Sequence, residues 1–269
     1  MSHDVDPRAV AARLSTRRAG DGPLLLCLHG IGGSSATFEP QLASLADLAT
    51  VVAWDAPGYA GSPDSGAHLT MDDYADVAAE VIEAHGQGRA AVLGMSWGGV
   101  IAMRLAQRHP ERVRALVLGD STRGSGRSPE TAAAMRSRAA ELAEVGPDVF
   151  AQRRAARLLR TSAPADEVAS QARAMASAIR LPGYGDATAS MAATWLDGSL
   201  GTIDVPTLVL HGDDDRITGA PESEAIAAQI PGAVLRVVPE AGHLANTENP
   251  MAFDAHVRSF LRALAPARR

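Results

Sequence analysis

The sequence predicts an α/β fold built around a mostly parallel, doubly wound β-sheet. Short apolar runs of strand length alternate with longer stretches of helical periodicity along most of the chain. Several of the runs carry no polar residue at alternate positions, which is typical of parallel strands covered by helices on both faces. Such alternation also predicts right-handed crossover connections between the strands.

The expected strands are apolar runs of four or five residues, each followed by a turn that contains glycine, proline or a polar residue. Runs this short and this apolar suit buried strands better than helices. In chain order the six runs are residues 24–28, 50–54, 90–93, 115–118, 207–210 and 234–238.

Helical periodicity appears between and after these strands. Thr70 is placed to cap the first helical stretch. Within it, Tyr74, Val77 and Val81 recur at spacings of three and four residues, so they share one face. The four expected helices of the core are residues 72–85, 100–107, 220–229 and 253–264.

The segment 121–201 interrupts the alternation of strands and helices. It is rich in Ala and Arg, has no convincing strand, and is broken at Gly146-Pro147, Pro164 and Pro182-Gly183. We therefore expect a helical cap of residues 121–201, inserted into a core domain of residues 1–120 and 202–269. Ligands of such sheets bind at the carboxyl ends of the strands, so this insertion is expected to cover the binding edge.

The composition excludes several kinds of chemistry. All 25 basic residues are arginine, which rules out a Schiff-base lysine, a lysine-anchored pyridoxal phosphate and a GK[ST] phosphate loop. The net charge of −6 argues against nucleic acid as a partner. The single cysteine, Cys27, lies in an apolar run and is interpreted as a buried hydrophobic residue. We expect no cofactor, no metal and no disulfide.

The chain shows no signal for a membrane. Its N-terminus lacks the apolar region of a signal peptide, and no apolar stretch reaches the length of a membrane span. We therefore expect a cytoplasmic protein that acts on a small molecule. No exposed apolar stripe stands out, so the sequence predicts no particular oligomeric state.

The stretch GMSWG, residues 94–98, is the strongest candidate for a catalytic corner. Ser96 lies between an expected strand and an expected helix, with Gly94 and Gly98 two residues away on either side. A sharp turn from strand to helix strains the central residue and leaves no room for side chains at those two positions. The alternative is that Ser96 is an ordinary turn serine that caps the helix. The context favours a nucleophile.

A serine nucleophile needs a base and a carboxylate that orients the base. His243 follows the last expected strand and precedes the last helix, whereas His29 and His211 each close a strand and suit structural hydrogen bonds. Asp215 follows another strand and precedes His243 by one helix and one strand, and Asp120 is the reserve candidate for the same role. In a parallel sheet these strand ends share one edge.

Acyl transfer by such a nucleophile also needs N–H donors for the developing oxyanion. The amide of Trp97, directly after Ser96, is the first candidate. Ile31, in the HGIGG loop after the first apolar run, is the second, and Gly30 and Gly32 allow the backbone to approach a ligand closely. Without a G-x-G-x-x-G spacing or a lysine, the loop is a poor phosphate cradle.

Side chains of the 121–201 segment are the candidates for substrate binding. Met135 and Trp195 are the main candidates for an apolar lining, together with Met175, Met191 and Phe150, although packing within the cap explains them equally well. Residues 121–200 hold ten arginines against eight acidic residues. A basic roof could attract a carboxylate-bearing substrate, but solvated helix faces are the favoured interpretation of these arginines.

The ordered motifs HGIGG, DAPGYAGS, GMSWGG, HGDDDRIT and AGHLANTENP resemble those of the α/β-hydrolase superfamily over residues 20–264. Within it, the chain is similar to bacterial esterases and lactonases related to 3-oxoadipate enol-lactonases. The resemblance implies a structural turn at residues 55–59. It also implies a serine hydrolase that cleaves an ester or lactone through an acyl-enzyme. A thioesterase, a carbon–carbon bond hydrolase and a non-catalytic ligand-binding protein are the alternatives.

Overall fold

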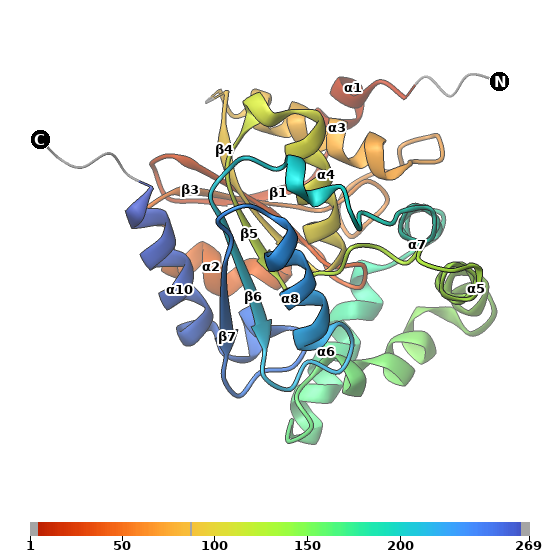
Figure 1. The fold of residues 1–269 in the computed structure, drawn as a ribbon. Helices are drawn as coiled ribbons and strands as arrows, with labels where there is room; N and C mark the ends of the chain where they lie inside the picture. The colour runs from red at the N-terminus through yellow and green to blue at the C-terminus, as the bar shows by residue number, and fades with distance from the viewer. Residues whose placement is uncertain (1–4, 87, 265–269) are drawn as a thin grey trace, which may run out of the picture.

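The computed structural model describes residues 5–86 and 88–264, and its centre is a seven-stranded sheet with the order β1-β3-β2-β4-β5-β6-β7 (Figure 1). All neighbouring strands are parallel except β1 and β3. The strands are β1 (Thr16–Ala19), β2 (Leu24–Leu28), β3 (Thr50–Trp54), β4 (Ala90–Met95), β5 (Val113–Gly119), β6 (Thr207–Gly212) and β7 (Val234–Val238). The predicted fold class is confirmed.

The six predicted strands correspond to β2 through β7, and the sequence analysis missed only β1 among the strands of the sheet. This strand has the sequence TRRA and pairs antiparallel with β3 at one edge, with Thr16 opposite Trp54. Three of its four residues are exposed, so no apolar pattern marks it. Its place in the sheet depends on backbone pairing with β3, which a periodicity pattern cannot reveal.

Helices cover both faces of the sheet, and alternate residues of each central strand face opposite layers. Leu24, Leu26 and Leu28 of β2 pack in the layer that contains α3 and α4, whereas Leu25 and Cys27 face α2 and α10. The helices of the core are α1 (Pro7–Ala11), α2 (Glu39–Ser44), α3 (Met71–Ala84), α4 (Trp97–Arg108), α8 (Gly219–Gln229), α9 (Ala245–Glu248) and α10 (Pro250–Ala263). Short 3-10 helices span Ser35–Phe38, Pro110–Arg112 and Leu200–Thr202.

Several local predictions for the core are confirmed. The side chain of Thr70 accepts a hydrogen bond from the amide of Asp73 and so caps α3. Cys27 is fully buried, and burial raises the pKa of its thiol. The predicted turn after β3 is held by Asp55, whose carboxylate accepts from the amides of Ser35 (2.7 Å) and Gly61 (3.1 Å). The turn therefore ties two loops together.

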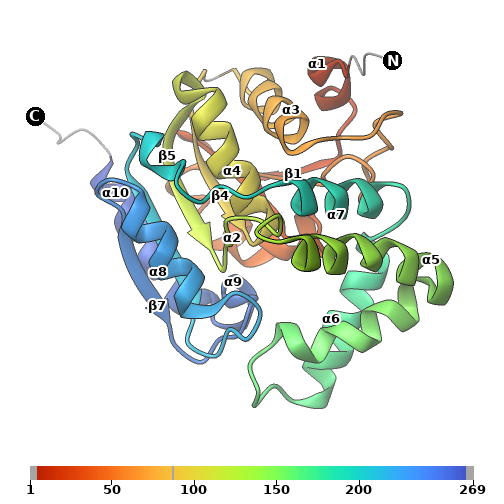
Figure 2. The same ribbon diagram turned by 45° about the vertical axis from the view of Figure 1, so that its right-hand side comes forward.

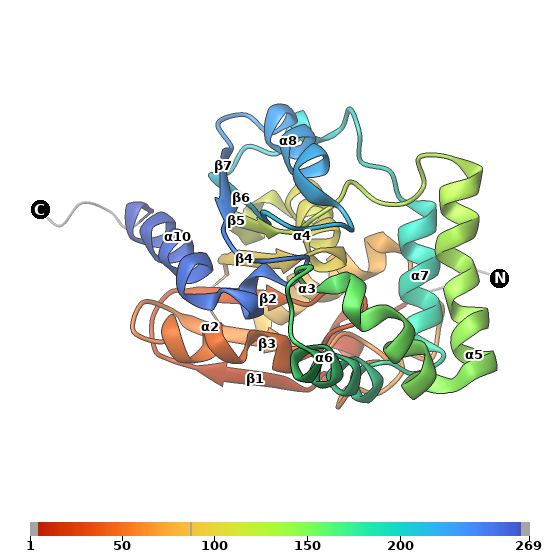
Figure 3. The ribbon, with the colours of Figure 1, turned by 90° about the horizontal axis from the view of Figure 1, so that it is seen from below.

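The segment 121–201 forms a helical group beside the carboxyl ends of the strands (Figures 2 and 3). It consists of α5 (Pro129–Leu158), α6 (Ala165–Ala178) and α7 (Gly183–Ala193). The breaks fall where the sequence predicts them: α5 bends at Gly146, whose φ is 74°, and Pro164 and Pro182 directly precede α6 and α7. Within the described residues, no helix has both the length and the apolar character needed to cross a membrane.

Candidate active site

Ser96 occupies the corner between β4 and α4 in a strained backbone conformation. Its φ and ψ are 49° and −112°, in a region that side chains rarely adopt, and its amide donates to the Gly119 carbonyl at 2.8 Å. A Cβ on Gly94 would lie 2.3 Å from the Gly98 carbonyl oxygen, and one on Gly98 would lie 2.0 Å from the Leu28 carbonyl oxygen. The corner therefore closes only because both positions are glycine.

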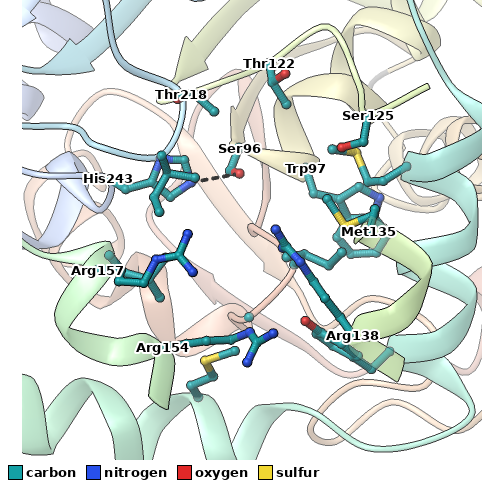
Figure 4. A pocket seen from close by; sticks show the side chains of 17 residues that line it. Ser96, Trp97, Thr122, Ser125, Met135, Arg138, Arg154, Arg157, Thr218 and His243 are labelled. Atoms are coloured by element: carbon teal, nitrogen blue, oxygen red, sulfur yellow. Dashed lines mark hydrogen bonds between the residues drawn. The ribbon is translucent and has the colours of Figure 1, made fainter. Parts of the chain in front are cut away.

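His243 lies within hydrogen-bond distance of both Ser96 and Asp215. Its Nε2 is 3.0 Å from Ser96 Oγ, and its Nδ1 is 3.1 and 3.0 Å from the two carboxylate oxygens of Asp215. Because the ionised Asp215 can only accept, Nδ1 carries the proton in the neutral ring and Nε2 is left to accept from the Ser96 hydroxyl. Three loops, after β4, β6 and β7, thus bring the three side chains together (Figure 4 shows the Ser96–His243 contact).

The carboxylate of Asp215 is fixed by the start of α8. It accepts hydrogen bonds from the Ile217 amide (2.8 Å), the Gly219 amide (3.0 Å) and the Thr218 hydroxyl (2.7 Å). Burial opposes its charged form, but the contacts with His243, Thr218 and Gly219 outweigh burial and hold the pKa of Asp215 below its ordinary value. Asp215 therefore remains ionised and presents a negative charge to the imidazole.

The pKa of His243 is raised above its ordinary value of 6.5. Burial favours the neutral ring, but the hydrogen bond and charge of Asp215 outweigh it, and Asp120 adds to their effect. The positive charge of Arg138 acts in the opposite direction and lowers this pKa. The site thus stabilises a protonated imidazole, as a general base requires after it has accepted a proton.

Asp120, the reserve candidate for the carboxylate that orients His243, forms different contacts. Its two carboxylate oxygens accept from the amides of Gly212 (2.9 Å) and Ala245 (3.0 Å), so it joins the end of β6 to the start of α9. Burial raises its pKa to about 7. The structure pairs His243 with Asp215 instead, and Asp120 supports the loops around them.

The loop after β2 lies directly against Ser96. A Cβ on Gly30 would lie 3.3 Å from Cβ of Ser96. The His29 ring accepts at Nε2 from the Ala56 amide (3.0 Å) and donates from Nδ1 to the Gly30 carbonyl (2.8 Å), and burial lowers its pKa to about 4. His29 is therefore a neutral ring with the predicted structural role.

Tyr59 also supports this loop, a role that the sequence analysis did not assign. Its hydroxyl donates to the Ile31 carbonyl at 3.0 Å, which fixes the peptide plane next to the candidate donor amide. Trp97 is the first residue of α4, where an amide has no carbonyl of an earlier turn to bond. Ile31 and Trp97 both line the space in front of Ser96.

Ser96 and His243 open on a cavity of about 210 Å³ beneath the helical segment (Figure 4). The other lining residues are Ile31, Gly32, Trp97, Thr122, Ser125, Met135, Arg138, Arg154, Arg157, Leu158, Met175, Tyr184, Met191, Ile217 and Thr218. A smaller adjoining cavity includes Gly30. The three methionines of the helical segment thus face this space, among them Met135.

Two of the predicted lining residues do not line the cavity. The Trp195 ring packs beneath the Arg123 guanidinium, whose central carbon lies 4.7 Å from the ring centroid. The backbone of Trp195 forms an isolated β-bridge with that of Gly124. The Phe150 ring is fully buried and packs beneath Arg154 at 3.8 Å. Both aromatic side chains pack within the helical segment. This is the alternative that the sequence analysis gave for them.

The favoured interpretation of the arginines in this segment, solvated helix faces, is incomplete for three of them: Arg138 and Arg154 are half-buried, and Arg157, although exposed, also lines the cavity. Arg138, Arg154 and Arg157 line the cavity, and their guanidinium groups extend toward its centre (Figure 4). Helical periodicity could not reveal this, because the direction in which these side chains point depends on how α5 bends and packs. Among the described residues, none of those that line the cavity is acidic.

No group of three or more His, Cys, Asp or Glu side chains suited to a metal ion occurs within residues 5–86 and 88–264. The polar side chains around Ser96 instead form one chain of hydrogen bonds, from the hydroxyl through the imidazole to a carboxylate. Such an arrangement can transfer a proton from a hydroxyl group to a ring nitrogen. Serine-based hydrolases use an arrangement of this kind.

Comparison with known proteins gives the family. The chain matches the family model described as the alpha/beta hydrolase fold over residues 23–250, and it belongs to that family. A 2-hydroxymuconate semialdehyde hydrolase from Pseudomonas sp. (strain CF600) is 32% identical, with 94% of this chain and 92% of that protein covered. The 3-oxoadipate enol-lactonase 2 of Acinetobacter baylyi is 25% identical, with 94% of each covered.

A solved structure is also similar over nearly the whole chain. The malate-bound structure of a thermophilic esterase from Thermogutta terrifontis matches with a TM-score of 0.87 and 29% identity. The match covers 94% of both chains. These relatives are hydrolases, as is this protein. Their names indicate different substrates, so the substrate of this protein must be inferred from its own cavity.

Proposed function

We propose that this enzyme is a serine hydrolase that cleaves a carboxylic ester or lactone of a small molecule through an acyl-enzyme. The observation that carries the proposal is the hydrogen-bonded series Ser96–His243–Asp215, which opens on an internal cavity. In this proposal Ser96 is the nucleophile, His243 the general base and Asp215 the residue that orients the ring. The esterase and the enol-lactonase among the similar proteins support ester or lactone chemistry.

In the first half-reaction, Ser96 Oγ attacks the carbonyl carbon while His243 Nε2 takes the hydroxyl proton. The carbonyl π electrons move to oxygen, and the amides of Ile31 and Trp97 donate hydrogen bonds to the resulting oxyanion. When the tetrahedral intermediate collapses, the carbon–oxygen bond to the alcohol breaks. His243 gives its proton to the leaving oxygen, and the acyl group remains on Ser96.

In the second half-reaction, water replaces the alcohol. His243 Nε2 accepts a proton from water as its oxygen attacks the acyl carbon, and the same two amides hold the oxyanion. The bond to Ser96 then breaks, and the serine oxygen recovers a proton from His243. The carboxylic acid leaves; for a lactone, acid and alcohol remain in one product molecule.

We further propose that the chain divides into a core domain of residues 1–120 and 202–269 and a cap of residues 121–201. Contacts between the last turn of α5 and the site support the proposal that the cap covers the reacting groups of the core. The His243 amide donates to the Leu158 carbonyl at 2.8 Å, and Leu158 itself lines the cavity. The core supplies the reacting groups in this proposal, and the cap closes the space around the substrate.

A fluorophosphonate probe and a serine variant test the proposed function. We expect the probe to label Ser96 in the folded protein, and we expect Ser96→Ala to lower kcat for every hydrolysed ester by about 10⁴-fold or more, because members of such a triad act as a unit. Ser137→Ala is the matched control, since Ser137 is exposed on α5 and donates only to the Ala134 carbonyl.

The probe and a substrate panel also separate the alternatives. Esters, lactones, acyl thioesters and substrates with a scissile carbon–carbon bond would be compared with the purified protein. Near-normal turnover by Ser96→Ala would disprove the proposed mechanism. Absence of both labelling and turnover would favour the non-catalytic ligand-binding protein.

A further inference from the structure

The part of the chain that the structure describes lines the cavity in front of Ser96 with three positively charged residues and no negatively charged one. Arg138, Arg154 and Arg157 direct their guanidinium groups into it (Figure 4), although the whole chain has a net charge of −6. Like charges in a confined space repel one another, and water screens them less there than at the surface. This local concentration of positive charge requires an explanation.

The bend in α5 brings these arginines together. Arg138 belongs to the part of the helix before Gly146, and Arg154 and Arg157 belong to the part after it. Arg154 and Arg157 are three residues apart, so they lie on the same face of their half. Because Gly146 leaves the helical conformation, both halves can face the same space.

Arg154 already has its counter-charge. Its guanidinium donates to both carboxylate oxygens of Glu141, at 3.1 and 2.7 Å, and lies 3.8 Å from the centre of the Phe150 ring. A two-point ion pair combined with an aromatic contact holds a guanidinium firmly. Arg154 therefore contributes position and shape to the cavity but little net charge.

Arg138 and Arg157 have no such partner. In the part of the chain that the structure describes, no ion pair within 4.0 Å joins either guanidinium to a carboxylate. Burial lowers the pKa of Arg138, and the charges of Arg154 and Arg157 lower it further. An anion placed between Arg138 and Arg157 would offset the desolvation of Arg138 and the repulsion between the two guanidinium groups.

A second buried polar group lies beside Arg138. The hydroxyl of Tyr184, a residue that lines the cavity, is fully buried and interacts with the Arg138 guanidinium. Burial raises the pKa of Tyr184, so the hydroxyl stays protonated. This contact therefore supplies no negative charge to the guanidinium.

We propose that the ester or lactone hydrolysed at Ser96 carries a carboxylate group, which is bound by Arg138 and Arg157. This inference rests on the proposed function and adds the class of substrate. A guanidinium matches the two coplanar oxygens of a carboxylate, and the pair supplies more than one charge-assisted hydrogen bond. The substrate thus spans the cavity from its carbonyl at Ser96 to its carboxylate at the arginines.

Matched esters test the proposal. One set pairs the monomethyl esters of succinate, glutarate and adipate with the corresponding monoamides, which have the same shape without the charge. A second set pairs 4-acetoxybenzoate with 4-acetoxybenzamide, so that the charge lies on the alcohol half. We expect kcat/KM to favour the anionic member of at least one pair by about ten- to a hundredfold, as charge-assisted hydrogen bonds would provide, and the preference to weaken as salt is raised.

Variants test which residues cause the preference for the anionic ester. Arg138→Gln and Arg157→Gln should each reduce the anionic-to-neutral ratio of kcat/KM, with most of the change in KM. Arg136→Gln is the matched control, because Arg136 is exposed, lies outside the cavity lining and points to another side of α5. It removes the same charge and should leave the ratio as it is. A ratio near one in the unaltered enzyme for both sets, with neutral esters hydrolysed well, overturns the proposal.

A measurement without turnover separates this proposal from the proposed function. Adipate should slow the labelling of Ser96 by a fluorophosphonate, whereas adipamide should not, and Arg138→Gln should abolish the difference. If Ser96 is labelled and adipate gives no more protection than adipamide, the carboxylate site is wrong although the serine chemistry stands. If adipate stabilises the protein against thermal unfolding but Ser96 is never labelled, the serine mechanism fails and the anion site stands.

Discussion

The edge of the sheet that carries Ser96 and the helical segment above it are built on different principles. At the sheet edge, backbone geometry sets the site: Gly94 and Gly98 permit the corner, and loops after three parallel strands deliver Ser96, Asp215 and His243. In the helical segment, long side chains on a bent helix determine the shape and charge of the cavity. The comparison shows why the contacts around Ser96 can be predicted from short motifs in this protein, whereas the shape and charge of the pocket cannot.

The largest expected effect comes from a glycine at the sheet edge. Gly98→Ala would place a Cβ 2.0 Å from the Leu28 carbonyl oxygen, where only backbone movement can relieve the clash. We expect a loss of about 3 kcal/mol in the free energy of unfolding, the upper range for overpacking, and a loss of Ser96 labelling. Denaturant unfolding followed by circular dichroism measures the first effect.

Gly185→Ala, in α7 of the helical segment, is the contrasting control. A Cβ there would meet Leu181 and Ala139 at 3.6 and 3.8 Å, which are ordinary contacts. Alanine has the higher helix propensity, so this variant should unfold at the same denaturant concentration or a slightly higher one. Equal destabilisation by the two changes would contradict the difference drawn between the two regions.

An intermediate effect is expected where the two regions meet. The side chain of Glu248 accepts from the Gly242 amide (2.7 Å), next to His243, and from the Arg160 amide (2.7 Å), just beyond α5. Glu248→Gln replaces one of these acceptors with a donor, which costs about 1–3 kcal/mol for the unpaired group. Because Glu248 holds the backbone next to His243, we expect kcat to fall several-fold in folded protein, together with the rate of Ser96 labelling.

Glu224→Gln is the matched control for this prediction, because Glu224 is exposed on α8. It should change neither kcat nor the labelling rate. A drop in unfolding temperature for Glu248→Gln with unaltered kcat and labelling would show that Glu248 only stabilises the fold and doesn't position His243.

The smallest expected effect is a shift in pH dependence. His243 must be neutral to accept the Ser96 proton, and its pKa is raised, so kcat/KM for a neutral ester should rise with pH along a limb centred above 6.5. The charge of Arg138 lowers this pKa, so Arg138→Gln should move the limb to higher pH. A limb that moves to lower pH in this variant would mean that Arg138 does not act electrostatically on His243.

The sequence predicted the sheet edge in detail because each of its features is local. The six apolar runs became β2 through β7, and the corner at Ser96 has the strained backbone that its glycines imply. Strand β1 was missed, since its exposed TRRA sequence depends on pairing with β3. The sequence placed Asp215 ahead of Asp120 as the partner of His243, and the contacts of the two carboxylates agree with that order.

The pocket was less predictable because its residues belong to helices whose packing is not local. The helix breaks at Gly146, Pro164 and Pro182 were read correctly from the sequence. The same reading could not tell that Arg138 faces the cavity while Arg136 does not, or that Trp195 packs against Arg123. Helical spacing cannot distinguish an arginine that faces the cavity from one that faces only solvent, because the difference depends on the bend in α5.

Because α5 bends at Gly146, recognition of the substrate depends on how each half of the helix is rotated about its own axis. Each residue advances a helix by about 100°, so one residue inserted between Arg138 and Gly146 would turn Arg138 away from Arg157 without altering either side chain. The same insertion would leave the loops of Ser96, Asp215 and His243 untouched. Single insertions and deletions on either side of the bend therefore offer a route to new specificities in this scaffold, with the reacting groups held constant.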